Sequence, residues 1–255
     1  MFFGGRGTVH CNMDKGAGML DWLDGALFAH RGLHGPNKPE NSIAAFGAAI
    51  DAGYGIELDL RLTADGRVAV FHDEALERMT GAAGIIEESD AAALQFLQLR
   101  GPGRHSIPFL NTVLAMVRGK APLYLELKPS GRVGALEAAV AELLSRYNGP
   151  VLVASFQGLS VNWFAEHAPH LPRCLIIGPC PPGPIGEAQH RRERWHHKLS
   201  KPHAVSVHHE CQPDAWVARL GLQDVSLITW TLKSPAALAA ARTWADAYVF
   251  EGFMP

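Results

Sequence analysis

The stretch Ile56-Glu57-Leu58-Asp59-Leu60-Arg61 decides the fold, and Leu123-Tyr124-Leu125-Glu126-Leu127-Lys128 repeats its pattern. Residues alternate between the two faces of a strand, so each stretch predicts one apolar face and one charged face. The charged face has two interpretations. It faces solvent if the strands belong to an antiparallel sheet with one wet side. If the strands are parallel and buried on both sides, three carboxylates meet where unpaired charge is strongly unfavourable, and a metal ion is the usual compensation.

Further short apolar stretches predict strands along the whole chain. The predicted strands begin near residues 26, 56, 122, 151, 173, 204, 225 and 247, and a helical pattern follows each but the last, including one over 213–220. Eight alternating units in 255 residues predict a single α/β domain, a closed parallel (β/α)₈ barrel over 25–255. Residues 74–118 are long for a simple connection and predict a small insertion after the second strand.

The N-terminal segment and the bulk composition set limits on partners and location. Residues 1–24 are glycine-rich and predict a flexible arm, in which Met13 and Met19 leave the true start residue open. The formal net charge is −2 and the pI is near 6.7, which predicts no attraction to nucleic acid. The basic run 191–198 predicts a solvated helix face, or else a contact with a polyanion or partner.

The lack of a recognisable targeting signal and the spacing of the cysteines favour a cytoplasmic protein. We recognise no signal-peptide core and no apolar run of about 18 residues, so we expect no stable membrane insertion. The four cysteines, Cys11, Cys174, Cys180 and Cys211, are far apart in the sequence and predict reduced thiols. The sequence leaves the oligomeric state open.

Chemically active side chains fall at the ends of the first predicted strands. They are His30, Arg31, Glu57, Asp59, His72, Glu126 and Lys128. In a parallel barrel these ends form one rim, where active sites lie. Three carboxylates suit Mg²⁺ or Ca²⁺, two histidines suit general acid–base work, and the two cations suit a phosphoryl group. The set predicts metal-assisted phosphoryl transfer from an ester.

Each residue also has a purely structural interpretation. His30 could be an ordinary strand-end histidine, Arg31 a surface cation, and Glu126 with Lys128 an ion pair inside the barrel. The site interpretation is favoured because the structural one requires several independent coincidences at strand ends.

The ordered set of motifs resembles the glycerophosphodiester phosphodiesterase family. The matching stretches are His30-Arg31-Gly32, Pro39-Glu40-Asn41-Ser42, Ala45-Phe46, Glu57-Leu58-Asp59, Thr63-Ala64-Asp65-Gly66, His72-Asp73, Arg78-Met79-Thr80-Gly81, Glu126-Leu127-Lys128 and Thr229-Trp230-Thr231. The resemblance implies a TIM barrel enzyme that hydrolyses small glycerophosphodiesters to glycerol 3-phosphate and an alcohol. The substrate's own glycerol hydroxyl is one candidate for the first nucleophile.

The resemblance also implies roles for individual residues. It assigns the divalent ion to Glu57, Asp59 and Glu126, and acid–base catalysis to His30 and His72, with His30 preferred as the base. It assigns phosphate binding to Arg31 and Lys128, support of these groups to Glu40 and Asn41, and the glycerol or alcohol side to Trp230. Glu251 stands where the family usually has Asp. His34, His208 and His209 have no family role, and each is expected to be a core or surface histidine or to reach the substrate.

The sequence also allows two alternatives to this hydrolase. A sphingomyelinase D-like or lysophospholipase D-like phospholipase resembles the family in fold and in its His, Glu-x-Asp, His set. Such enzymes are commonly secreted with disulfides, so the scattered cysteines disfavour this alternative. An inactive barrel acting as a binding protein would be expected to lack a metal ligand or a histidine, and the sequence retains all of them.

Overall fold

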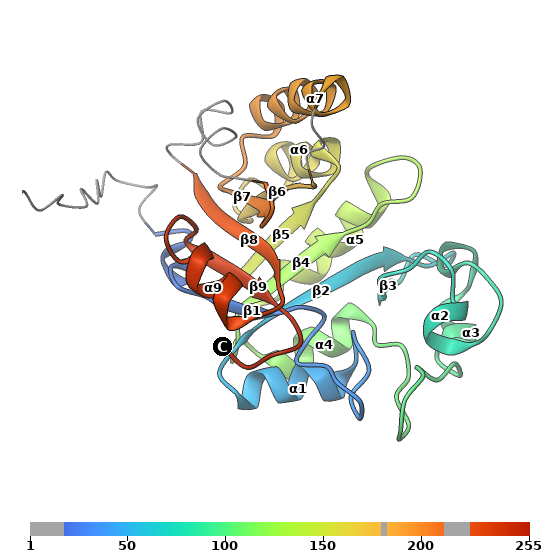
Figure 1. The fold of residues 1–255 in the computed structure, drawn as a ribbon. Coiled ribbons are helices and arrows are strands. Elements are labelled where there is room, and N and C mark those ends of the chain that lie inside the picture. The colour runs from blue at the N-terminus through green and yellow to red at the C-terminus, as the bar shows by residue number, and fades with distance from the viewer. Residues whose placement is uncertain (1–17, 180–182, 212–224) are drawn as a thin grey trace, which may run out of the picture.

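The computed structural model describes residues 18–179, 183–211 and 225–255, and in this part eight parallel strands close into a barrel (Figure 1). The barrel strands are β1 Leu27–Ala29, β2 Gly55–Leu62, β4 Leu123–Leu127, β5 Val151–Ser155, β6 Arg173–Ile177, β7 Ala204–His208, β8 Ser226–Leu232 and β9 Ala247–Phe250. Their order around the barrel follows the chain, and β1 closes it by pairing with both β2 and β9. The predicted (β/α)₈ barrel is confirmed.

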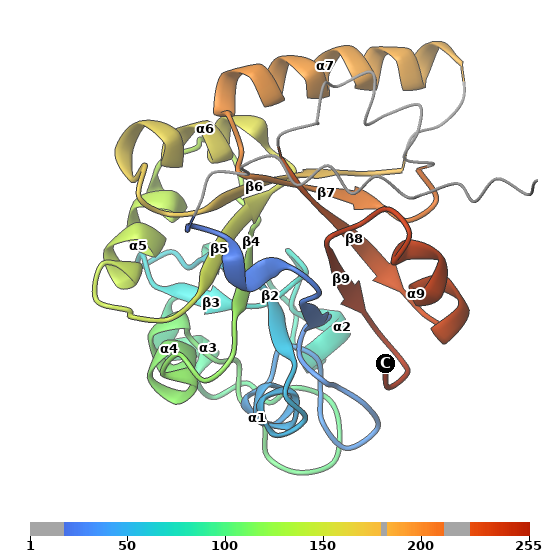
Figure 2. The same cartoon turned by 90° about the vertical axis from the view of Figure 1, so that its left-hand side faces the viewer.

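Helices cover the outside of the barrel. They are α1 Ile43–Asp51, α4 Leu110–Val117, α5 Ala135–Leu144, α6 Gly158–His167, α7 Pro184–Ser200 and α9 Pro235–Ala241, with α7 beside α6 at one end of the view in Figure 2. Ser42 caps α1, because its side chain accepts a hydrogen bond from the backbone N–H of Ala45. The helix predicted over 213–220 lies outside the described residues. Within the described part of the chain, none of the helices has the length and apolarity to cross a bilayer.

Alternation along the strands separates two cores. Ile56, Leu58 and Leu60 point outward and join the main core between the strands and the helices. A second core fills the barrel interior and includes Phe28 and Tyr124. The inner core also includes Leu23 from the 3₁₀-helix η1, Asp21–Leu23. Part of the segment 18–24 is therefore packed against the barrel, whereas 1–17 lie outside the described residues.

The connection after β2 forms a separate packing unit. It contains β3 Val68–Val70, which pairs antiparallel with β2, and the short helices α2 Glu77–Thr80, η2 Ile86–Glu88 and α3 Ala91–Leu94. Its own apolar core includes Phe71, Leu76, Ile86, Leu94 and Ile107. The predicted insertion, 74–118, also includes α4. The buried residues of α4, spaced at helical period, join the main core, so α4 belongs to the helical layer of the barrel.

Candidate active site

The charged faces of β2 and β4 lie inside the barrel. Glu57 and Asp59 are only 2% and 0% exposed, and Asp59 is in register with Glu126 on the neighbouring strand. The interior below them, toward the start of the strands, is apolar. Of the two interpretations of these strands, the structure therefore supports the buried acidic cluster and excludes the wet sheet face.

Three carboxylates form the centre of the site. Glu57, Asp59 and Glu126 each offer an oxygen within 4.8 Å of the other two. One oxygen of Glu57, Oε1, is buried without a hydrogen-bond partner. An all-oxygen donor set with an unpartnered buried carboxylate oxygen fits a hard divalent ion such as Mg²⁺ or Ca²⁺.

The electrostatics of the cluster also indicate that positive charge is needed. Burial raises the pKa of Glu57 well above its usual range, and the charges of Asp59 and Glu126 add to the rise. Burial likewise raises the pKa of Glu126. At Asp59 burial acts in the same direction, but nearby cations, Lys128 first, outweigh it and lower the pKa to about 2. Two of the three carboxylates therefore remain unfavourable as anions unless a cation joins them.

Lys128 is an ion-pair partner of this cluster. Its Nζ lies 3.2 Å from Oδ1 of Asp59 and also contacts Oε1 of Glu126. The site interpretation of the sequence left Lys128 to the phosphate, whereas the structural interpretation paired it with Glu126. The structure shows that pairing, because residues two apart on a strand share a face, which places Lys128 beside Glu126.

An unusual turn after β1 delivers Arg31 to the cluster. Arg31 has φ 55°, a left-handed conformation, and its backbone N–H donates to Oε2 of Glu57 at 2.8 Å. Its side-chain Nε lies 3.4 Å from Oδ2 of Asp59. At Gly32 a Cβ would meet Ala45 and Phe46 at 2.9 Å, so the turn has no room for a side chain at this position. Positive φ is uncommon at a non-glycine residue, and here it brings both the backbone N–H and the side chain of Arg31 to the carboxylates.

Glu40 and Asn41, which the resemblance assigns to support of the site, contact an arginine and a carboxylate of the cluster. The Nδ2 of Asn41 donates to Oδ2 of Asp59 at 2.8 Å, and Glu40 accepts from Nη1 of Arg31 at 2.8 Å. Asn41 is also left-handed, with φ 53°. The loop before α1 therefore fixes both a carboxylate and the arginine beside it.

Each predicted catalytic histidine has a carboxylate at its Nδ1. His72 Nδ1 lies 2.7 Å from Oδ1 of Asp73, and His30 Nδ1 lies 3.4 Å from Oε2 of Glu251. The Nε2 of His30 lies 4.0 Å from Glu57. A carboxylate at Nδ1 favours the tautomer with its proton there and leaves Nε2 to exchange a proton with another group.

Two residues missed by the sequence interpretation complete these contacts. Glu251, at the end of β9, contacts His34 and Lys233 as well as His30, and the histidine contacts lower its pKa. Arg61 donates from Nε to the backbone carbonyl of His72 at 2.8 Å. The sequence signals were weak: Glu251 appeared only as a departure from the family pattern, and Arg61 only as the end of the charged strand face.

Aromatic side chains line the other side of the rim. Trp230, on β8, packs edge-on against Phe156 at 5.5 Å and against His208 at 4.9 Å between ring centroids. The backbone N–H of His209 donates to the carbonyl of Trp230 at 2.9 Å. His208 therefore belongs to an aromatic group with Trp230 and Phe156, and Phe156 remains 42% exposed.

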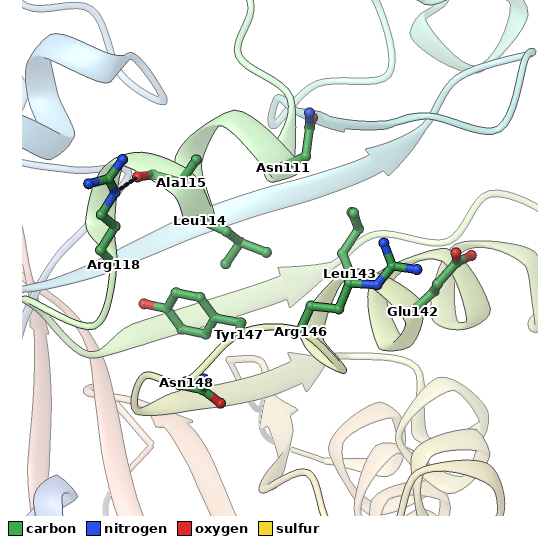
Figure 3. A pocket seen from close by; sticks show the side chains of 9 residues that line it. All are labelled: Asn111, Leu114, Ala115, Arg118, Glu142, Leu143, Arg146, Tyr147 and Asn148. Carbon is green, nitrogen blue, oxygen red and sulfur yellow. Dashed lines mark hydrogen bonds between the residues drawn. The ribbon is translucent and has the colours of Figure 1, made fainter.

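A cavity of about 290 Å³ opens beside Glu126 and Lys128 and is also lined by Arg61 and Phe156. Its lining includes one member of the carboxylate cluster, Glu126, and one member of the aromatic group, Phe156. A second, larger cavity of about 470 Å³ lies between α4 and α5 on the outside of the barrel (Figure 3). Its lining, which includes Arg118 and Arg146, contains none of the residues of the carboxylate cluster.

Residues 30–253 match the glycerophosphoryl diester phosphodiesterase family. The chain is 39% identical over 165 residues to a glycerophosphodiester phosphodiesterase of Bacillus altitudinis, covering 59% of this chain and 65% of that protein. It is 34% identical over 157 residues to one of Caldanaerobacter subterraneus, covering 57% and 63%. The chain thus spans slightly less than two thirds of the length of these relatives.

Solved structures share the fold. A phosphodiesterase of Oleispira antarctica, in complex with the product sn-glycerol-3-phosphate, superposes with a TM-score of 0.79 at 24% identity, over 91% of this chain and 94% of that one. A glycerophosphodiester phosphodiesterase of Thermotoga maritima gives a TM-score of 0.71 at 22% identity, over 89% and 94%. Both are barrels of the kind described above.

Proposed function

The chain belongs to the glycerophosphoryl diester phosphodiesterase family, and we propose that it hydrolyses glycerophosphodiesters to glycerol 3-phosphate and an alcohol. The observation on which this rests is the buried cluster of Glu57, Asp59 and Glu126, flanked by two histidines that each have a carboxylate at Nδ1. The Oleispira antarctica relative, solved with sn-glycerol-3-phosphate, supports a small-molecule substrate.

The three carboxylates would hold a divalent ion, Mg²⁺ or Ca²⁺. When bound, such an ion supplies positive charge to phosphoryl oxygens and lowers the pKa of a coordinated hydroxyl. Lys128 lies beside two of the carboxylates and Arg31 beside one of them, so both cations are placed to bind the phosphate of the substrate.

The two histidines would divide the proton transfers. His30 is backed by Glu251 and removes a proton from the attacking oxygen, which belongs to water or to the substrate's glycerol hydroxyl. His72 is backed by Asp73 and donates a proton to the oxygen of the leaving alcohol. Burial lowers the pKa of His72, which makes it a stronger acid toward that oxygen. Trp230 and its aromatic neighbours would line the alcohol side.

A direct assay tests the proposed function. Purified full-length protein is incubated with glycerophosphocholine or glycerophosphoethanolamine, with Mg²⁺ or Ca²⁺ or with EDTA, and released glycerol 3-phosphate is measured. We expect release only with a divalent ion, and loss of at least about 100-fold in H30A and H72A. Absence of release with every divalent ion would refute the proposal. Faster turnover of sphingomyelin or lysophosphatidylcholine vesicles would favour the phospholipase alternative.

A further inference from the structure

Arg78, in the helix α2 of the insertion, binds two carboxylates from different parts of the chain. Its Nη2 lies 3.0 Å from Oδ1 of Asp73, and its Nε contacts the other oxygen of the same carboxylate. Its Nη2 also lies 2.7 Å from Oε1 of Glu40, and Nη1 lies 3.0 Å from Oε2. A guanidinium group has a planar fork of donors that suits this double arrangement.

Both carboxylates also contact groups of the proposed active site. Asp73 contacts His72, the proposed general acid, at 2.7 Å. Glu40 accepts from Arg31, the proposed phosphate ligand, at 2.8 Å. One guanidinium therefore stands behind both the proton donor and the phosphate-binding arginine, and it touches neither.

The backbone around Arg78 is held by the core of the insertion. Leu76 precedes α2 and is 2% exposed in that core, and its backbone N–H donates to the carbonyl of Gly84 at 3.0 Å. Gly81 ends the helix in the left-handed conformation. The pKa of Asp73 is lowered to about 2, chiefly by the hydrogen bonds from Arg78. Asp73 therefore remains an anion beside His72.

We propose that Arg78 is a positioning residue that sets His72 through Asp73 and Arg31 through Glu40, and so makes the insertion part of the catalytic apparatus. This inference rests on the proposed function. The side chain of Arg78 is 47% exposed. Exposed ion pairs contribute little to folding stability, so its removal is expected to change catalysis more than folding.

The test compares two leaving groups. Glycerophosphocholine releases an alkoxide that needs a proton, whereas the p-nitrophenyl ester of glycerol 3-phosphate releases a stable phenolate that does not. R78A is expected to lower kcat for glycerophosphocholine by about 10- to 100-fold and kcat for the nitrophenyl ester by less than about 3-fold. KM is expected to rise for both substrates, because Glu40 loses the contacts with Arg78 that hold it against Arg31. R78K keeps the charge without the fork and is expected to recover only part of kcat.

Arg104 provides the matched control, since it is an exposed arginine of the same insertion. R104A is expected to match the wild type on both substrates. A loss in R78A that is equal for the two leaving groups, or no larger than in R104A, would overturn the proposal. If wild-type protein cleaves neither ester, the proposed function has failed, and that result is distinct from a failure confined to R78A.

A second measurement does not depend on activity. Nitrogen-15 spectra of histidine-labelled protein at fixed pH report the ring tautomers, with H72Q used to assign the His72 signals. In the wild type and in R104A, we expect His72 with its proton on Nδ1, and in R78A and D73N a mixture of tautomers. An unchanged tautomer in R78A would show that Arg78 does not position His72.

Discussion

His72 illustrates how single contacts set the chemistry of the site. Burial lowers its pKa, and the charge of Asp59 and the hydrogen bond to Asp73 oppose that effect. Asp73 acts on the ring most directly, because its carboxylate contacts Nδ1 of His72 at 2.7 Å. A general acid must hold its proton at the working pH, so the hydrogen bond to Asp73 extends the pH range in which His72 can act.

Replacement of Asp73 should move the pH profile in one direction. D73N weakens the hydrogen bond that, after the larger effect of the Asp59 charge, raises the pKa of His72. His72 then loses its proton at lower pH, and the alkaline limb of kcat shifts to lower pH. At about pH 8 we expect kcat for glycerophosphocholine to fall by about tenfold. The check is a pH series of kcat, with the exposed Asp90→Asn as control. A shift of the alkaline limb to higher pH would contradict the assignment of His72 as acid.

The connection between β2 and α4 is the element that most affects the site from outside the barrel. It is stabilised by its own core and contains His72, Asp73 and Arg78. Local stability of this element is therefore expected to be linked to catalysis, and residues of its core should influence kcat without contacting substrate.

Leu94 and Phe96 test this link as a matched pair. Leu94 is fully buried in the insertion core, whereas Phe96 is 78% exposed. L94A should destabilise the protein by about 2–5 kcal/mol, and F96A should stay within about 0.5 kcal/mol. Urea unfolding measures both, and hydrogen exchange should show the loss in the insertion, with a lower kcat in L94A alone. Equal stability of the two variants would contradict the packing described here.

Helix α7 contains a buried acid outside the active site, and its effect is on stability. Glu193 is 4% exposed, and burial raises its pKa to about 7, although Gln189 donates to it at 2.9 Å. The folded state binds this proton more tightly than the unfolded state does. The contribution of Glu193 to folding stability is therefore fully present below its ordinary pKa and is lost as the pH rises from about 4.5 to about 7.

Removal of this acid should therefore stabilise the protein at alkaline pH. E193Q is expected to raise the free energy of unfolding by about 1 kcal/mol at pH 8, after solvent screening is allowed for, and to change it little at pH 4. Urea titrations at the two pH values measure this, with the exposed Glu187→Gln of the same helix as control. A stabilisation of E193Q that is larger at pH 4 would refute the assignment.

At the scale of the whole molecule, the carboxylate cluster links strands that the chain joins only through the insertion and α4. Glu57 and Asp59 come from β2 and Glu126 from β4, and these strands are paired over five residues. The three acids repel one another inside the closed barrel. A divalent ion bound to all three would therefore stabilise the folded barrel as a unit.

Thermal unfolding should reveal this binding. Saturation with Mg²⁺ or Ca²⁺ at about 100 times Kd is expected to raise the Tm of the wild type by about 5–10 °C. E57Q removes one repelling charge, so in EDTA it should be at least as stable as the wild type. E57Q should also show no metal-dependent rise in Tm, and its activity should be lower than that of the wild type by about 100-fold or more. The exposed Glu88→Gln should behave like the wild type, whereas a metal-dependent rise retained in E57Q would exclude Glu57 as a ligand.

The strands and the acidic cluster could be predicted because their signals are local. A period of two is visible in the sequence, and strand pairing then brings Asp59 opposite Glu126. The contact of Glu251 with His30 could not be predicted, because it depends on how β9 closes the barrel against β1. The pairing of Lys128 with Glu126 follows from the same period of two, whereas its contact with Asp59 depends on side-chain direction at a strand end. The approach of Arg31 to the carboxylates requires a left-handed backbone conformation, which an arginine in the sequence does not indicate.

The site is divided unequally along the chain. The proposed metal ligands and proton-transfer residues lie within 30–128, whereas Phe156, His208 and Trp230 come from the later strands. Recognition of the alcohol can therefore diverge in evolution without disturbing the hydrolytic half of the barrel. Chimeras joined within α5 should exchange leaving-group preference between relatives and retain phosphodiester cleavage, provided that the later half still presents a carboxylate to His30 at the position of Glu251.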